Sequence, residues 1–234
     1  MKDIINKYSM KELSGRDARL WKEWKELDDL YEKRKKESIN PRRPSISYIV
    51  RRKNVMGLPT EYEIHYRVRS IVGVEDGPAP RKPIFGNLHK MLIRLPSNYP
   101  SADGNPEFYF ITDIWHPNIR SAGQFKGKVC LTINEMGVLA SLKDLVLRVE
   151  RYLKYKLYHA KNTYPYPEDQ DVAEWVREEG EPNGWLHFGT ETSASESQAS
   201  VAQIAPSAQE TTAIPEPVQE KVTEVKPTIR TITI

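Results

Sequence analysis

The chain has 234 residues, a length that fits one ordinary domain with an appendage. Its 35 basic and 32 acidic residues give a net charge of +3, a balance too even to indicate nucleic acid as a partner. It contains no apolar run long enough to cross a membrane and no recognisable signal peptide, so we expect a cytoplasmic protein with no membrane partner. The single cysteine, Cys130, excludes an internal disulfide and a cysteine-based zinc site.

The first predicted element is an amphipathic helix that begins near Ser14 and continues to about Lys35. Ser14 followed by Asp17 is typical of a helix-capping box. Apolar residues then recur at helical spacing, namely Leu20, Trp24, Leu27 and Tyr31. The other face is expected to present basic residues to solvent, among them Arg16, Arg19 and Lys22.

The next part of the chain, from Ser45 to about Thr112, is rich in β-forming runs. These runs are ISYIVRR, TEYEIHYRVRSIVGV, LHKMLIRL and EFYFIT. In the second run, Tyr62, Ile64, Tyr66 and Val68 alternate with charged or polar residues, which is typical of a half-buried antiparallel strand. Turn-forming clusters separate the runs, so we expect a four-stranded antiparallel meander.

Helical periodicity returns after Cys130. Ser141 and Asp144 are spaced to cap a helix with a single apolar stripe, which contains Leu142, Leu145, Val146, Val149, Tyr152 and Leu153. A shorter helix, EDQDVAEWVREE, is expected between Pro167 and Gly180. A leading helix, a run of strands and then helices that cover the sheet predict an α+β fold.

The folded domain is expected to cover residues 1–188, and a low-complexity tail residues 189–234. No Phe, Tyr or Trp follows Phe188, and a segment such as TETSASESQASVAQIAPSAQE cannot bury enough apolar surface to offset the entropy of ordering it. We therefore expect a disordered tail. Its last residues, VKPTIRTITI, are either frayed or able to add a strand to the sheet of a partner.

An irregular segment joins the predicted sheet to the later helices. It contains His116-Pro117-Asn118, then a glycine-containing turn and Cys130-Leu131. Together with Tyr99-Pro100 before the fourth strand, these residues resemble the HPN signature, the catalytic cysteine and the YPxxPP segment of ubiquitin-conjugating enzymes. The resemblance spans roughly residues 14–180 and includes the leading helix.

The chain departs from the pattern of that family in three places. The gap between the HPN motif and the cysteine is a few residues longer, with Gln124–Lys128 as the expected insertion. Val138 and Leu139 stand where the family commonly has a tryptophan-proline pair, and the second proline of YPxxPP falls late, at Pro106. These differences indicate a remote member of the family, and we consider a prokaryotic conjugation system as its source.

The resemblance implies a chemistry. A thiol is both a nucleophile and a leaving group, so Cys130 would accept a ubiquitin-like modifier from an activating enzyme as a thioester. It would then pass the modifier to a lysine of a protein substrate, with or without a ligase, and without a cofactor or metal. Two alternatives stay open: a noncatalytic ubiquitin-binding module of the same fold, and an unrelated α+β scaffold in which Cys130 is a buried hydrophobe.

The resemblance also implies roles for single residues. Asn118 would donate a side-chain N–H to the oxyanion or order its own turn, while His116 and Pro117 would support the loop around the cysteine. Asp169 would orient or deprotonate the lysine, although Glu168 and Asp171 are adjacent candidates and acids at a helix start need no function. The leading helix would meet the activating enzyme through three basic residues, Arg16, Arg19 and Lys22.

Overall fold

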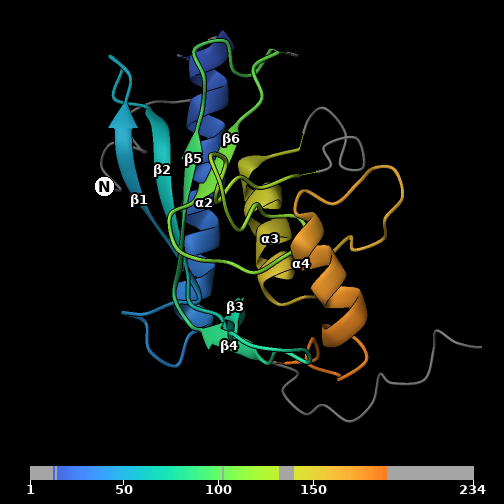
Figure 1. Cartoon of the computed structure of the whole chain (residues 1–234). Helices are drawn as coiled ribbons and strands as arrows, with labels where there is room; N and C mark the ends of the chain where they lie inside the picture. Colours follow the sequence, from blue (N-terminus) through green and yellow to red (C-terminus); the bar gives the residue numbers. More distant parts are fainter. Residues whose placement is uncertain (1–12, 14, 102, 132–139, 189–234) are drawn as a thin grey trace, which may run out of the picture. The chain divides into compact units, whose positions relative to one another are not determined.

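The structure is a computed structural model that describes residues 13, 15–101, 103–131 and 140–188 (Figure 1). The first element among the described residues is a long helix, α2 (Gly15–Glu37). Strands follow in the order β1 (Ile46–Lys53), β2 (Pro59–Tyr66), β3 (Ser70–Val74), β4 (Pro83–Gly86), β5 (His89–Arg94) and β6 (Glu107–Phe110). The later elements are α3 (Leu142–Leu153), α4 (Gln170–Trp175) and the π-helical turn η2 (Val176–Gly180). The predicted α+β fold is confirmed, whereas the predicted tail lies outside the described residues.

Strands β1, β2, β5 and β6 form one antiparallel sheet in that order, which confirms the predicted four-stranded sheet. The alternation along β2 places Tyr62, Ile64 and Tyr66 in the core, where each is fully buried. The second predicted run does not continue as one strand. It leaves the sheet after Tyr66, and its last residues form β3, which pairs with β4 in a separate two-stranded sheet.

The break between β2 and β3 has a cause in hydrogen bonding. Arg67 donates its backbone N–H to Ser45 O at 2.7 Å, so it is held at the start of β1. His89 is fully buried, and its Nε2 lies 3.0 Å from Val68 O. The Arg67 bond continues the β1–β2 ladder one residue past the Ile46–Tyr66 pair, and the chain leaves the sheet at Val68, where the His89 side chain takes the place of a strand partner. The β3–β4 hairpin forms below the sheet in the view of Figure 1.

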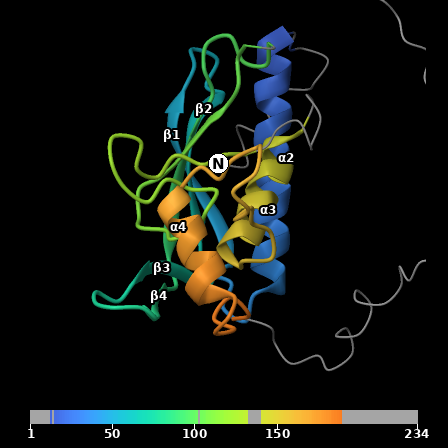
Figure 2. The ribbon, with the colours of Figure 1, turned by 45° about the vertical axis from the view of Figure 1, so that its right-hand side comes forward.

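Helices α2 and α3 pack against each other and enclose the main core with the sheet (Figure 2). All apolar residues predicted for the stripe of α3 are buried. On α2 the buried apolar residues are Leu20, Trp24, Leu27 and Leu30, so Leu30 is buried where Tyr31 was expected. Ser14 of the predicted capping box lies outside the described residues, and the Asp17 carboxylate accepts a hydrogen bond from Asn54 Nδ2 at 2.8 Å.

A buried carboxylate ties α2 to α3. Glu23 is 1% exposed and accepts hydrogen bonds from the Leu142 N–H at 2.6 Å and from the Tyr99 hydroxyl at 2.7 Å. Its charge is balanced by Arg19, whose Nε lies 2.6 Å from the same carboxylate. A buried acid with this many partners is stabilised only while all of them stay in place.

The two later helices begin at side-chain caps. Ser141 Oγ accepts from the Asp144 N–H at 3.2 Å, as predicted. Helix α4 begins after Asp169, which accepts from the Val172 N–H at 3.1 Å, and not at Pro167. Within the described residues, no helix is long and apolar enough to cross a membrane, and no group of three or more His, Cys, Asp or Glu side chains is placed to bind a metal ion.

Candidate active site

The HPN segment and the cysteine segment lie side by side. Cys130 donates its backbone N–H to Asn118 O at 2.8 Å, and Ile119 forms an antiparallel bridge with Val129. Val129 in turn donates to Phe108 O at 3.0 Å, which attaches the pair to the edge strand β6. Backbone pairing therefore places the only cysteine of the chain directly against the HPN segment.

The turn between the two segments depends on Gly127. Its φ is +85°, and an added Cβ would collide with the backbone of Phe110. The Gly127 N–H donates to Arg120 O at 2.7 Å, which closes a hairpin whose tip is exposed, with Phe125 56% exposed. The predicted insertion, Gln124–Lys128, thus lies at and beside this tip and leaves the pairing of the two segments intact.

His116 supports the loop as an uncharged side chain. It is fully buried, its Nδ1 accepts from the Asn118 N–H at 3.1 Å, and its Nε2 lies 3.2 Å from Leu157 O. The ring stacks on Tyr152 with centroids 5.0 Å apart. Burial lowers the pKa of His116 to about 3, so the imidazole is neutral at physiological pH. With both nitrogens engaged, this geometry favours the predicted supporting role over a general base.

The Asn118 side chain is oriented by one hydrogen bond. Its Oδ1 accepts from the His159 N–H at 2.9 Å, and the residue is 6% exposed. Among the described residues, its Nδ2 makes no hydrogen bond. The amide therefore orders the loop through its oxygen and keeps its two N–H donors for another group, so both predicted roles remain compatible with the geometry.

The Cys130 thiol is partly exposed. Burial raises the pKa of Cys130, the Glu168 carboxylate raises it further, and the cations of Lys128 and Arg148 oppose this rise. At neutral pH the group is therefore mostly a thiol, and the fraction of reactive thiolate increases with pH. The Tyr152 hydroxyl donates to Cys130 O at 3.4 Å, which connects the cysteine to the stacking partner of His116.

Asp169 is engaged in hydrogen bonds within the protein. It is 4% exposed, and one carboxylate oxygen accepts from the Ser121 N–H at 2.7 Å and from the Ser121 hydroxyl at 2.8 Å. The other oxygen caps α4 through Val172, and the Asp169 N–H donates to Pro117 O at 3.0 Å. Both oxygens are in use before any substrate arrives. This geometry favours a helix cap and loop anchor, and the lysine-orienting role of Asp169 stays a prediction.

Glu168 is the acid that acts on the cysteine electrostatically. Its carboxylate raises the pKa of Cys130. Its Oε1 lies 3.5 Å from Lys128 Nζ and 3.7 Å from Arg120 Nη2, and its side chain is 13% exposed. These ion pairs are long, so the carboxylate can exchange partners at small cost. Asp171, the third candidate, lies exposed in the first turn of α4.

Part of the chain is similar in sequence to proteins of known family. A segment of 79 residues, 33% of the chain, is 34% identical to ubiquitin-conjugating enzyme E2 K of Bos taurus, Homo sapiens and Mus musculus. Over this segment, the chain is similar to ubiquitin-conjugating enzymes. The matched segment covers 36% of E2 K, so the chain spans about a third of the length of these curated relatives.

Solved structures of ubiquitin-conjugating enzymes are similar at a lower level. A protein described as a ubiquitin-conjugating enzyme from Plasmodium yoelii is 23% identical, with 73% of this chain and 90% of that chain covered and a TM-score of 0.45. Human ubiquitin-conjugating enzyme E2 G1 is 20% identical, with 54% and 90% covered and a TM-score of 0.33. Both TM-scores are low, so the similarity to this family rests on the sequence match to E2 K. No family model matches the chain.

In helix α2, two of the three basic residues that were expected to face solvent make hydrogen bonds within the protein. Arg16 Nη2 donates to Pro96 O at 3.2 Å, and Arg19 Nε donates to the Tyr99 hydroxyl at 3.1 Å. Arg19 thus belongs to the Glu23 network, contrary to the expectation of a solvated face. Lys22 keeps a side chain that is 49% exposed. A contact of this helix with an activating enzyme stays a prediction.

Proposed function

We propose that the chain is a ubiquitin-conjugating transferase that carries a ubiquitin-like modifier as a thioester on Cys130 and passes it to a lysine amine. The observation that supports this most directly is the hydrogen bond of 2.8 Å from the Cys130 N–H to Asn118 O. It holds a partly exposed thiol against the HPN segment. The match to E2 K supports the same chemistry.

In the proposed loading step, the Cys130 thiolate attacks the carbonyl carbon of a modifier bound as a thioester to an activating enzyme. A new carbon–sulfur bond forms as the old one breaks, and the departing thiolate takes up the proton that Cys130 released. The raised pKa of Cys130 lowers the fraction of thiolate at neutral pH. It also makes Cys130 a poorer leaving group, so the loaded thioester resists unassisted hydrolysis. Because the thiol must stay reduced, we place this chemistry in the cytoplasm.

In the proposed discharge step, a lysine amine attacks the carbonyl carbon on Cys130 and the thiolate leaves. Negative charge gathers on the carbonyl oxygen. Asn118 Nδ2, which makes no hydrogen bond to the described part of the chain, has the chemistry to donate one there. The attacking amine loses a proton. We assign the acceptor of that proton to Glu168, because the oxygens of Asp169 are already bound by Ser121 and Val172.

The proposal is tested by incubating the full chain with a candidate activating enzyme, a modifier and ATP. A charged protein carries an adduct that dithiothreitol removes. Cys130→Ala should give no adduct, and Cys130→Ser should give an adduct that survives thiol but yields to alkali, because an oxyester resists thiolysis. The thermal unfolding of each variant serves as the folding control.

Since the chain contains one cysteine, a thiol-sensitive adduct on Cys130→Ala would refute the assignment. The second candidate function, a noncatalytic binding module, gives a different pattern. In that case the modifier would bind reversibly and equally to wild type and to Cys130→Ala, and no adduct would form with any activating enzyme tested.

A further inference from the structure

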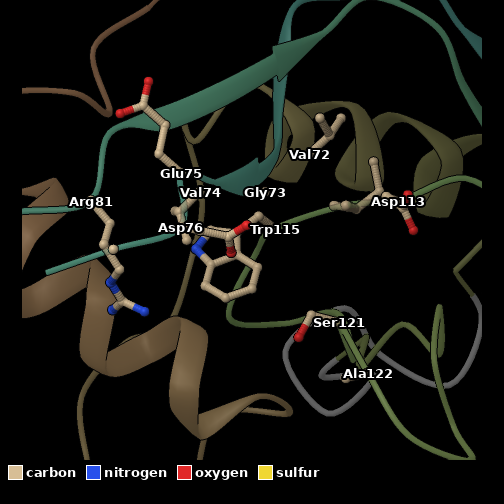
Figure 3. Close-up of a pocket in the computed structure, with 12 residues that line it drawn as sticks. Val72, Gly73, Val74, Glu75, Asp76, Arg81, Asp113, Trp115, Ser121 and Ala122 are labelled. Carbon is tan, nitrogen blue, oxygen red and sulfur yellow. The ribbon is translucent and has the colours of Figure 1, made fainter.

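A cavity of about 450 Å³ lies between the β3–β4 hairpin and the two stretches that flank the HPN motif, Asp113–Trp115 and Ser121–Ala122 (Figure 3). We call it the hairpin cavity. Its lining includes Val72, Val74, Asp76, Asp113, Trp115 and Ser121. We propose that the hairpin cavity binds a cationic side chain of the acceptor protein, a few residues from the acceptor lysine. This inference rests on the proposed function and adds a substrate preference to it.

The walls of the hairpin cavity are held in place from both sides. The Arg81 guanidinium donates to Glu179 Oε1 at 2.6 Å and 3.0 Å, and Arg81 O accepts from Trp175 Nε1 at 3.0 Å. On the opposite side, the Trp115 N–H donates to Ile71 O at 3.0 Å. A preformed wall loses little conformational freedom on binding, so contacts made in the cavity contribute to affinity.

The lining of the hairpin cavity has an excess of negative charge. Asp76 and Asp113 are exposed, while Figure 3 shows the Glu75 carboxylate directed away from Trp115. The basic residue in the lining, Arg81, already forms an ion pair with Glu179, so it does not offset these acids. Lys126 Nζ lies 2.6 Å from Asp113, but the two side chains are 56% and 67% exposed, so water screens this pair and a ligand can replace it. A cation is therefore favoured over an anion.

The remaining surfaces suit the stem of a long basic side chain and its backbone. Val72, Val74 and the Trp115 ring offer apolar contact for the methylene groups, and an indole face attracts a cation. Trp115 Nε1 is buried and has no hydrogen-bond partner among the described residues. An unpaired buried donor is costly, so a shift of the indole that brings Nε1 to a carbonyl oxygen of a bound peptide would be stabilised.

Ser121 connects the hairpin cavity to the proposed path of the lysine. It lines the cavity, and its N–H and hydroxyl both donate to Asp169, the residue after Glu168. The cavity therefore lies on the side of the HPN segment where we place the acid that receives the lysine. An extended peptide advances about 3.3 Å per residue, so a residue a few positions from the lysine can reach the cavity. This position favours the acceptor over the modifier as the source of the cation.

The test uses the full chain carrying Cys130→Ala, so that binding is measured without acyl transfer. The probes are the acetylated peptides Ala-Arg-Lys-Arg-Ala and Ala-Glu-Lys-Glu-Ala, titrated while the amide signals of Gly77 and Ala122 and the indole signal of Trp115 are followed by NMR. The basic peptide should shift these signals saturably, and the acidic peptide should not. Asp76→Asn and Asp113→Asn should each weaken binding about twofold to fivefold. Asp103→Asn, an exposed acid outside the lining, is the matched control and should bind as the parent does.

Each outcome decides the proposal. Unmoved cavity signals, equal response to both peptides or equal loss with Asp103→Asn would overturn it. If the Asp76 and Asp113 variants bind the basic peptide normally but load modifier onto Cys130 more slowly, the cavity serves the modifier and our assignment is wrong. If the peptide saturates the cavity as expected while Cys130 never forms a thioester, the subsite stands and the proposed function fails.

Discussion

Glu168 and Asp169 are adjacent, yet we expect their substitution to have opposite effects. Asp169→Ala should destabilise the protein and leave the chemistry of the folded molecules nearly unchanged. Glu168→Gln should leave stability nearly unchanged and slow the transfer of modifier to lysine. The difference follows from their contacts, because the Asp169 oxygens are bound by Ser121 and Val172 while the Glu168 ion pairs are long.

The size of each effect follows from these contacts. Loss of the α4 cap in Asp169→Ala costs about 1 kcal/mol. The Ser121 N–H is left without its acceptor, which costs about 1–3 kcal/mol more. For a domain of this size about 2–4 °C correspond to each kcal/mol, so the unfolding temperature should fall by about 5–15 °C. Glu168→Gln removes two ion pairs of 3.5 Å and 3.7 Å, worth about 0–1 kcal/mol.

The assay combines thermal unfolding with single-turnover decay of purified, preloaded thioester in excess free lysine, at a temperature where every variant is folded. Glu168→Gln should load normally and discharge at least about tenfold more slowly. Asp169→Ala should discharge at nearly the wild-type rate per folded molecule. Asp171→Asn, an exposed acid in the same first turn, is the matched control. If Asp169→Ala keeps the wild-type unfolding temperature and loses discharge, then Asp169 receives the lysine and our reasoning from its contacts is wrong.

Four further predictions follow from the same structure. Asn118→Ala should load normally and discharge to free lysine about 10- to 1000-fold more slowly, and equal decay at every pH would leave Asn118 as a turn residue. The rate at which iodoacetamide alkylates Cys130 should report a pKa above that of a free cysteine, and Glu168→Gln should lower that pKa, since burial and then Glu168 raise it. Because burial lowers the pKa of His116 to about 3, its contribution to stability is present above the unfolded pKa of about 6.5 and is lost as pH falls below it. Urea unfolding should therefore show about 2 kcal/mol less stability at pH 5 than at pH 7, and a flat profile would contradict this. Glu23→Ala should cost about 3–5 kcal/mol in the same assay, because it leaves buried partners unpaired, and a loss below about 1 kcal/mol would show that the network contributes little.

Local patterns predicted the helices better than the sheet connections. The cap of α3 and its apolar stripe follow from residues close in sequence, and both are present. The second β-rich run reads as continuous, yet the chain leaves the sheet after Tyr66. At the break, Val68 O lies 3.0 Å from Nε2 of the buried His89, a residue of a different segment, so periodicity within the run does not contain it.

The same distinction applies to the candidate site. The resemblance of the HPN motif to a known family indicated that this segment lies near Cys130, and the backbone hydrogen bond from the Cys130 N–H to Asn118 O joins the two segments. The choice between Glu168 and Asp169 depends on Ser121, which reaches Asp169 from another part of the chain. The inward orientation of Arg19 depends in turn on the burial of Glu23, and a charge pattern on a helix gives no sign of a buried acid.

Backbone contacts hold the centre of the candidate site, and this explains how it tolerates the departures from the family pattern. Asn118 O receives the Cys130 N–H, and Pro117 O receives the Asp169 N–H, so neither link needs the carbonyl residue to have a particular side chain. The longer hairpin is anchored to β6 at Gly127, whose carbonyl accepts the Phe110 N–H, and its tip at Phe125 is exposed. Substitutions or insertions at the hairpin tip and in the walls of the hairpin cavity should therefore leave the Cys130 thiol in place. If the proposed function holds, the paired backbone segments fix the position of the Cys130 thiol, and the side chains around them select the acceptor protein.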